Sequence, residues 1–208
     1  MIDLQHRFGG MQRLYGVDAF ATIAQANICV VGIGGVGSWV AEALARSGVG
    51  KLTLIDMDDV SETNINRQLV ALESTLEVAK VEVMADRIKD INPACECTLV
   101  EDFIGSHNLD EYLDKGFDYV IDACDSIKAK AALINWCKRH KLPVLTIGGA
   151  GGQSFERSPR TNGECLRRHR SFFLMFSSTF FSAIFSPSIG RLIIGSRLLT
   201  KQALAAER

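Results

Sequence analysis

The sequence predicts an α/β fold in which a doubly wound, mainly parallel sheet carries helices on its faces. Short apolar runs of strand length alternate with longer segments of helical spacing over residues 17–147, and parallel strands need such crossover helices. A glycine-rich run at residues 32–37 follows the first apolar run, at a point where a strand must turn into a helix. A chain of 208 residues can bury one substantial core.

The expected elements follow one another in this alternating order. Residues 17–25 predict a short amphipathic helix. Residues 28–33 are apolar, too short for a helix of their own and end in glycines, so a buried strand is expected. Residues 38–47 have helical spacing, with Val40, Ala43 and Leu44 on one face. The other expected strands are 52–55, 98–100, 118–123 and 144–147, and the other expected helices are 77–91, 107–115 and 127–140.

The glycine-rich run predicts a nucleotide site. Its first glycine permits a tight turn, its second lets a phosphate approach the backbone, and its third lets the helix pack closely on the strand. The start of the following helix offers free N–H groups to an anion. Asp56 ends the next strand, where a carboxylate binds ribose hydroxyls. The alternative is a purely structural turn. The glycines concerned are Gly32, Gly34, Gly35 and Gly37.

Two cations favour ATP over a dinucleotide at this site. Arg67 and Lys80 follow the second strand, and a triphosphate with a departing pyrophosphate needs such charges. Asp58 adds a carboxylate beside the ribose site. Asp122 and Asp125 end the fourth strand, at the edge where ligands bind and where magnesium could bridge the phosphates.

Each of these residues also has a simpler reading when it is taken singly. The cations could be solvated surface charges, the aspartates helix caps and Asn66 a turn residue. A nicotinamide-dependent dehydrogenase is a further alternative. It would need an acid or base at a hydride site, which the sequence does not show, and it would leave the two cations unexplained.

Three motifs resemble the ThiF/MoeB superfamily of adenylate-forming, ubiquitin-activating-enzyme-like proteins. They are GIGGVGSWVAEALARSGVGKLTLIDMDDV at residues 32–60, TNINRQ at 63–68 and IDACDS at 121–126. RFGGMQRLYG at 7–16 and TIGGAGGQ at 146–153 resemble the branch that dehydrates a modified tRNA nucleoside. No motif of residues 154–208 resembles the family. The resemblance implies a Rossmann-like fold over residues 1–153.

The resemblance also implies a role for each matching residue. The four glycines would line the ATP phosphates, Asp56 and Asp58 would lie at the ribose, and Asn66, Arg67 and Lys80 would bind and polarise the triphosphate. Asp125 would hold Mg²⁺. An N-terminal arginine would reach the partner's ATP in a homodimer, with Arg13 the candidate and Arg7 its rival.

The implied reaction is ATP-dependent cyclisation of threonylcarbamoyladenosine in tRNA through an acyl-adenylate. One alternative is adenylation of the C-terminus of a sulfur-carrier or ubiquitin-like protein, which would make a sulfur-transfer protein a partner. Another is an inactive, truncated nucleotide-binding module.

The charge distribution also changes at about residue 153, where the resemblance to the family ends. The whole chain has a net charge of −1, so no global basic field indicates nucleic acid. Residues 1–153 hold 14 Lys and Arg against 21 Asp and Glu, whereas residues 154–208 hold 9 against 3. A basic RNA-binding arm around residues 167–170, a membrane segment at 172–189 and a shifted reading frame are three interpretations of this tail. We expect it not to complete the family fold, adenylation to be impaired, and protease to cut near Gln153.

The six cysteines lack the C-x-x-C spacing of zinc ribbons, and we expect free, buried thiols. Cys95 and Cys97 are expected on opposite faces of a strand. Residues 1–13 lack an apolar signal-peptide core, which favours the cytoplasm.

Overall fold

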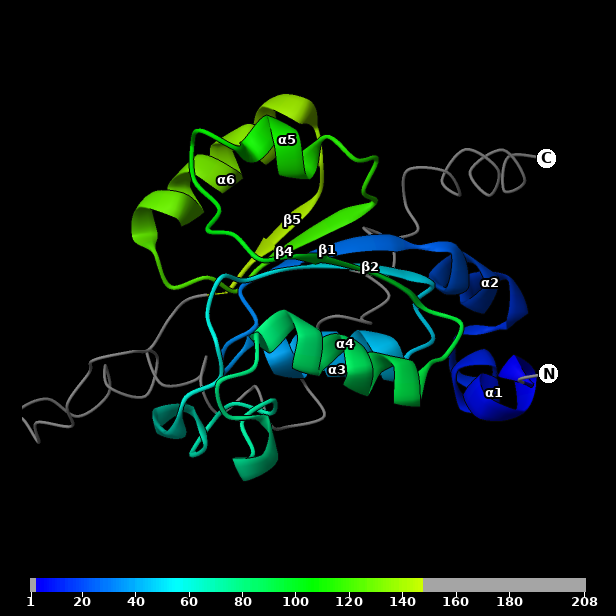
Figure 1. Cartoon of the computed structure of the whole chain (residues 1–208). Helices are drawn as coiled ribbons and strands as arrows, with labels where there is room; N and C mark the ends of the chain where they lie inside the picture. The colour runs from blue at the N-terminus through cyan, green and yellow to red at the C-terminus, as the bar shows by residue number, and fades with distance from the viewer. Residues whose placement is uncertain (1–2, 148–208) are drawn as a thin grey trace, which may run out of the picture. The chain divides into compact units, whose positions relative to one another are not determined.

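In the computed structural model, residues 3–147 are described (Figure 1). Five parallel strands form one sheet of order β3-β2-β1-β4-β5. The sequence order reverses between β1 and β4, so this junction is the switch point beside which doubly wound sheets bind ligands. The predicted fold class is confirmed. The strands are β1 (Asn27–Val31), β2 (Lys51–Ile55), β3 (Glu96–Val100), β4 (Tyr119–Asp122) and β5 (Val144–Thr146).

Helices cover both faces of the sheet (Figure 1). Helices α3 (Gly37–Arg46) and α4 (Lys80–Ile91) lie on one face, and α5 (Leu109–Leu113) and α6 (Ile127–His140) lie on the other. Helices α1 (Leu4–Tyr15) and α2 (Val17–Gln25) lie at the amino-terminal ends of the strands. Phe8 of α1 packs on Phe20 of α2, and both approach Gly48, just before β2. The carboxyl ends of the strands therefore face away from α1.

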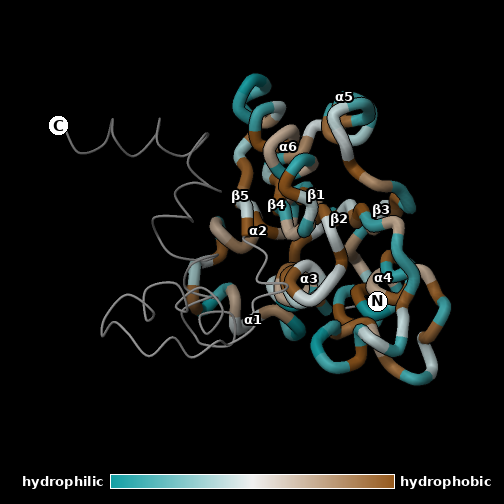
Figure 2. The backbone as a smooth tube through the Cα atoms, turned by 90° about the vertical axis from the view of Figure 1, so that its left-hand side faces the viewer, coloured by the Kyte–Doolittle hydropathy of each residue, from teal (hydrophilic) through white to brown (hydrophobic). Residues whose placement is uncertain are grey.

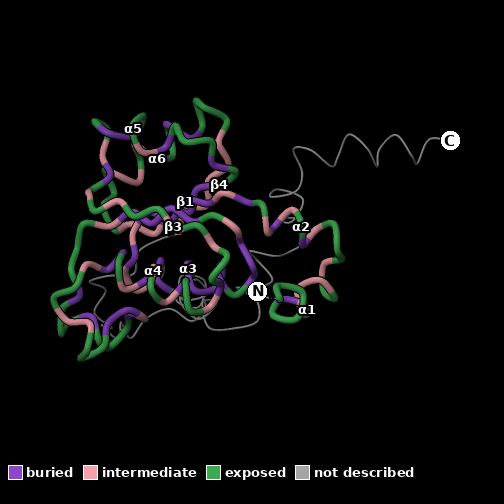
Figure 3. The backbone as a smooth tube through the Cα atoms, turned by 45° about the vertical axis from the view of Figure 1, so that its right-hand side comes forward, coloured by how far each residue is buried: buried purple, intermediate pink, exposed green. Residues whose placement is uncertain are grey.

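The core lies on both sides of the two central strands. All four residues of β4 are buried, as are Ile28 to Val31 of β1 (Figures 2 and 3). Burial on both faces is why these strands are apolar in the sequence, apart from Asp122 at the end of β4. Between the sheet and α5 and α6, an apolar cluster includes Leu113, Leu133 and Trp136. Strands fixed on both faces hold the loops at their carboxyl ends in place.

Most of the expected elements are confirmed with small shifts of their ends. Helices α2 and α6 have the predicted bounds. Helix α4 begins at Lys80 and not at residue 77, because Glu77 has a φ of 65° and Ala79 a ψ of 130°. Helix α5 is shorter than predicted and β3 is longer. Helix α1 and two short 3₁₀ turns, η1 (Glu62–Asn64) and η2 (Glu73–Thr75), were not expected from the sequence.

One expectation about cysteine is wrong, and a second is confirmed only in part. Cys95 and Cys97 are two residues apart, so they project to the same side, and their thiols are hydrogen-bonded. This bond raises the pKa of Cys95 and lowers that of Cys97. The five described cysteines are free thiols, but only Cys29 and Cys137 are fully buried. Cys165, like the predicted tail as a whole, lies outside the described residues.

Within residues 3–147, no helix is long and apolar enough to cross a membrane. The 172–189 stretch, for which a membrane segment was one interpretation, also lies outside the described residues.

Candidate nucleotide site

The glycine-rich loop connects β1 to α3 at the switch point. Gly32 has a φ of 87°, a conformation that L side chains rarely adopt, and its N–H donates to the Ile55 carbonyl at 2.8 Å. The chain turns so tightly that a Cβ on Gly37 would lie 1.6 Å from the Gly32 carbonyl oxygen. Gly34 and Gly35 have ordinary space around them, with no atom closer than 3.5 Å to a Cβ built there. The outer glycines therefore close the turn, and the middle two present open backbone.

Asp56 ties this loop to the end of β2. Its Oδ2 accepts a 2.5 Å hydrogen bond from the Ile33 N–H, and its Oδ1 accepts one from the Asp58 N–H at 2.9 Å. Burial raises the pKa of Asp56 above its usual value, although both backbone bonds act in the opposite direction. The carboxylate thus anchors the loop as well as standing where ribose is expected.

Arg67 lies directly beside the glycine loop. A Cβ on Gly35 would lie 3.5 Å from the Arg67 Cγ. The Arg67 Nη1 donates to the Thr63 carbonyl at 2.8 Å and to the Asn66 Oδ1 at 3.0 Å. The preceding turn, η1, is held by a reciprocal cap in which the Ser61 N–H donates to Asn64 Oδ1. The structure therefore gathers Asn66, Arg67 and the open glycines in one place.

Lys80 is the first residue of α4 and its side chain is only 5% exposed. Its ammonium lies 2.7 Å from the Asp58 Oδ2, and the Lys80 N–H donates to the Asp58 carbonyl. Asp58, expected at the ribose, is thus the partner that fixes the lysine. Its own side chain is 56% exposed, so the pair joins a buried lysine to an exposed carboxylate at the carboxyl edge.

Asp122, the last residue of β4, and Asp125, beyond the strand, have different surroundings. The Asp122 side chain is fully buried and forms a 2.7 Å ion pair with Lys130, so it does not face a ligand as the sequence analysis expected. Asp125 is exposed. Burial and the hydrogen bond that the Cys124 thiol donates to Asp122 raise the pKa of Cys124 to about 12. This cysteine is therefore a protonated thiol at neutral pH and not a ready nucleophile.

The glycine loop and the loop after β4 are in contact. A Cβ on Gly32 would lie 2.9 Å from the Cys124 nitrogen and 3.0 Å from the Ala123 carbonyl carbon. The Ala123 N–H also donates to the Val31 carbonyl at 2.8 Å. Asp125 and the open glycines consequently belong to one assembly. Among the described residues, no group of three or more side chains could hold a metal by itself.

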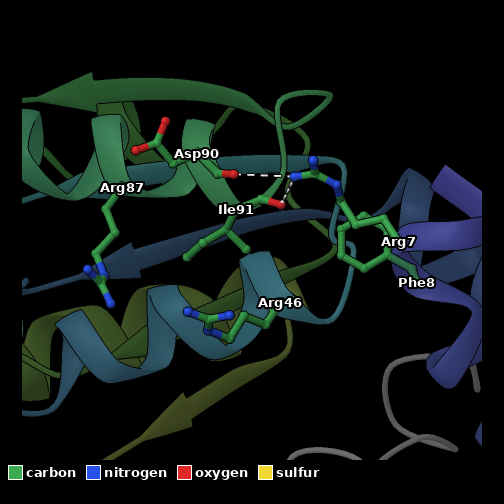
Figure 4. A pocket seen from close by; sticks show the side chains of 6 residues that line it. All are labelled: Arg7, Phe8, Arg46, Arg87, Asp90 and Ile91. Carbon is green, nitrogen blue, oxygen red and sulfur yellow. Dashed lines mark hydrogen bonds between the residues drawn. The ribbon is translucent and has the colours of Figure 1, made fainter. Parts of the chain in front are cut away.

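A separate hollow of about 500 Å³ lies at the C-terminal ends of α3 and α4, away from the glycine loop (Figure 4). Arg7 donates there to the carbonyls of Asp90 at 3.3 Å and Ile91 at 2.6 Å. Those carbonyls end α4, whereas Lys80 begins it, about 15 Å away along the helix axis. Arg7 thus binds the C-terminus of its own α4. The hollow is lined by Arg7, Phe8, Arg46, Arg87, Asp90 and Ile91.

Arg13 lies in the last turn of α1 and is exposed. Its guanidinium passes over Gly9, whose Cβ would lie 3.5 Å from Nη1. The structure does not bring Arg13 to the glycine loop of the same chain, because α1 lies at the amino-terminal ends of the strands (Figure 1).

A model of the ThiF family matches residues 10–177 of this chain. The chain belongs to the ThiF family. The match continues beyond Gln153, the last residue of the motifs identified from the sequence. Within the ThiF family, the chain is 60% identical over 150 residues to the tRNA threonylcarbamoyladenosine dehydratase of Haemophilus influenzae and 59% identical over 149 residues to that of Escherichia coli.

These alignments cover 72% of this chain but only 58% and 56% of those two relatives. The chain therefore spans less than three fifths of their length. The crystal structure of the E. coli dehydratase in complex with ATP matches with a TM-score of 0.70, covering 72% of this chain and 62% of that one. Another ThiF relative, the molybdopterin-synthase adenylyltransferase of H. influenzae, is 30% identical over 70% of this chain and 62% of its own length.

Two residues of the site were missed by the sequence analysis. Gln68 is 8% exposed, its Nε2 lies 3.8 Å from a Cβ built on Gly34, and its Oε1 accepts no hydrogen bond from the described residues. Its place in the TNINRQ motif was the available signal. Lys130 contacts Asp122 beneath the loop that carries Asp125, and helical spacing alone gave no signal for it.

Proposed function

We propose that this chain binds ATP at the carboxyl edge of its sheet and activates a carboxylate as an acyl-adenylate, as part of the dehydration of threonylcarbamoyladenosine in tRNA. The observation that carries the proposal is the placing of Arg67 beside the open backbone of Gly35, with Lys80 at the start of α4. A pyrophosphate leaving group needs fixed cations. The identity of about 60% to dehydratases supports the choice of substrate.

In this proposal the glycine loop holds the phosphates through its backbone N–H groups and Asp56 receives the ribose hydroxyls. Arg67 and Lys80 neutralise the charge that develops on the β- and γ-phosphates. Asp58 orients Lys80 through their 2.7 Å ion pair, and Asn66 restricts Arg67 through the 3.0 Å bond between their side chains. The contacts that hold these groups come from the protein itself, which is how preorganised electrostatics lowers a barrier.

The proposed chemistry has two steps. The threonyl carboxylate of the modified nucleoside attacks the α-phosphorus of ATP, a P–O bond forms, and the bond to pyrophosphate breaks. An atom of the same nucleoside then attacks the activated carbonyl carbon, closes a ring, releases AMP and loses a proton. Positioning and charge neutralisation suffice for both steps, so no nucleophilic side chain is required.

Asp125 is the residue proposed to hold Mg²⁺. Magnesium takes one or two carboxylates and completes its shell with phosphate oxygens and water, so a single exposed carboxylate beside the phosphate loop fits it. A bound magnesium ion would neutralise phosphate charge. Asp122 does not share this role, because its carboxylate is buried against Lys130.

We also propose that the active form is a homodimer in which Arg13 reaches the partner's nucleotide. Arg7, the rival, is occupied by the carbonyls of α4. Helix α1 and the glycine loop lie at opposite ends of strands about 16 Å long, so Arg13 can complete only another subunit's site. The division of the chain into an adenylation domain, residues 1–153, and a separate tail, residues 154–208, stays a proposal.

ATP–pyrophosphate exchange tests the proposed function in three parallel assays. One contains tRNA bearing threonylcarbamoyladenosine, one a sulfur-carrier protein with a free C-terminus, and one no acceptor. Exchange that depends on the tRNA is expected. Exchange with the carrier protein alone would instead place this chain with the adenylyltransferases.

Equilibrium binding of ATP and NAD separates these two adenylating functions from a nicotinamide-dependent dehydrogenase and from an inactive module. We expect magnesium-dependent affinity for ATP and little for NAD. Tighter binding of NAD would refute the proposal, and ATP binding without exchange in any assay would identify an inactive nucleotide-binding module.

A further inference from the structure

Lys130 lies in the first turn of α6, behind the loop that carries Asp125. Its ammonium donates to the Asp122 Oδ2 at 2.7 Å and to the Ile147 carbonyl at 3.0 Å. The Lys130 side chain is 16% exposed and that of Asp122 is fully buried. A single ammonium therefore joins α6 to the ends of β4 and β5.

Asp122 in turn holds the backbone of that loop. Its Oδ1 accepts hydrogen bonds from the Cys124 N–H at 3.2 Å and from the Cys124 thiol at 3.0 Å. Its carbonyl accepts from the Ile147 N–H at 2.9 Å. Because the Cys124 amide is adjacent to Asp125, the Asp122 carboxylate restricts where the Asp125 side chain begins.

The same stretch of backbone supports the glycine loop. Gly32 packs so closely on Ala123 and Cys124 that even a methyl group would not fit between them. A displacement of this backbone would therefore reach Gly32 and Asp125 together. The Lys130 ammonium lies at the base of both elements that are proposed to receive the phosphates and the metal.

We propose that Lys130 is a positioning residue of the nucleotide site. Held between Asp122 and the Ile147 carbonyl, it sets the Asp125 loop against the glycine loop in the geometry that binds magnesium and ATP. This inference rests on the proposed function and extends it to a residue that contacts neither ligand. Stability alone does not require an ion pair here, because apolar residues of similar volume often replace buried pairs without loss.

A pair of variants separates positioning from stability. Lys130→Met removes the ammonium but leaves the Asp122 carboxylate buried and unpaired, which endangers the fold. The double variant Asp122→Asn with Lys130→Met removes that charge too. We expect the double variant to recover the thermal midpoint of the wild type while its magnesium-dependent ATP affinity stays about 10–100-fold weaker. Lys138→Met, an exposed change on the same helix, is the matched control and should alter neither quantity.

Hydrogen exchange without nucleotide gives a second measurement. The Cys124 amide should exchange faster in the double variant than in the wild type and in Lys138→Met. If ATP affinity recovers together with the thermal midpoint, Lys130 is only structural and the inference is overturned. If the wild-type chain itself binds no ATP, the proposed function fails and takes this inference with it, a result distinguishable from the previous one.

Discussion

Alanine at Gly37 should reduce stability, whereas alanine at Gly34, in the same loop, should reduce ATP binding. A Cβ on Gly37 would lie 1.6 Å from the Gly32 carbonyl oxygen and 2.8 Å from its carbonyl carbon. Both atoms belong to the backbone, so no flexible side chain can move aside and the start of α3 must shift. A Cβ on Gly34 would have its nearest neighbour, the Gln68 Nε2, at 3.8 Å, an ordinary contact.

The expected magnitudes follow from these distances. Gly37→Ala should lower the free energy of unfolding by at least about 3 kcal/mol, the upper part of the range for overpacking, since the overlap is with rigid backbone. Gly34→Ala should change it by less than about 1 kcal/mol in either direction. Its methyl group would nevertheless occupy space that the phosphate needs, and ATP affinity should fall about tenfold or more.

Urea unfolding and ATP titration measure the two effects separately. Trp136 is 4% exposed and stacks on His140 with ring centroids 3.8 Å apart, so its fluorescence reports the folded state. Gly10→Ala, in α1, is the control, because the nearest atom to its Cβ would be 3.9 Å away and the site is at the other end of the sheet. A Gly37→Ala protein with the wild-type urea midpoint would refute the reasoning about packing. Wild-type ATP affinity in Gly34→Ala would refute the position assigned to the phosphates.

Four further substitutions test other parts of the structure. Glu42 forms ion pairs with Arg46 and Arg87. Burial would raise the pKa of Glu42, but the two arginines outweigh burial and lower it. The stabilisation that the ionised Glu42 gives is therefore present above the unfolded pKa of about 4.3 and is lost as the pH falls further. Glu42→Gln should therefore cost about 1–3 kcal/mol at pH 7, and urea unfolding should show the difference shrinking at about pH 3.5; an equal difference at both pH values would contradict this. Asp125→Asn should abolish magnesium-dependent ATP binding while changing stability by less than about 0.5 kcal/mol, and retained pyrophosphate exchange with magnesium would show the assignment to be wrong. Arg7→Ala should lower stability by about 0.5–2 kcal/mol through the lost bonds to α4, whereas Arg13→Ala should leave stability unchanged and reduce pyrophosphate exchange; the reverse pattern would exchange their roles.

The central strands could be predicted because a strand that is buried on both faces of the sheet is largely apolar in sequence, as in β1 and β4. Helix α1 could not, since Gly9 and Gly10 lower its intrinsic propensity and the packing of Phe8 on Phe20 stabilises it only in the folded chain. The start of α4 was misplaced for a related reason. The positive φ of Glu77 depends on the tertiary structure, and the spacing of apolar residues in the sequence does not indicate it.

The candidate site was predicted in outline because its motifs fall at strand ends, but not in its pairings. Asp122 and Asp125 look alike in sequence. Asp122, still within β4, is opposite Val31 and Thr146 and turns inward to Lys130, whereas Asp125 lies beyond the strand and is exposed. The pairing of Asp58 with Lys80 likewise spans 22 residues and depends on how the intervening turns fold.

The position of α1 has a thermodynamic consequence for the proposed homodimer. When the arginine of one subunit completes the nucleotide site of another, nucleotide binding and subunit association become linked equilibria. Each then strengthens the other by the same factor. Apparent ATP affinity should consequently rise with protein concentration, and saturating nucleotide should tighten the dimer in equal measure. Helix α1 lies at the far end of the sheet from the glycine loop. In the proposed dimer, the fraction of sites that hold nucleotide would therefore report the fraction of subunits that have associated.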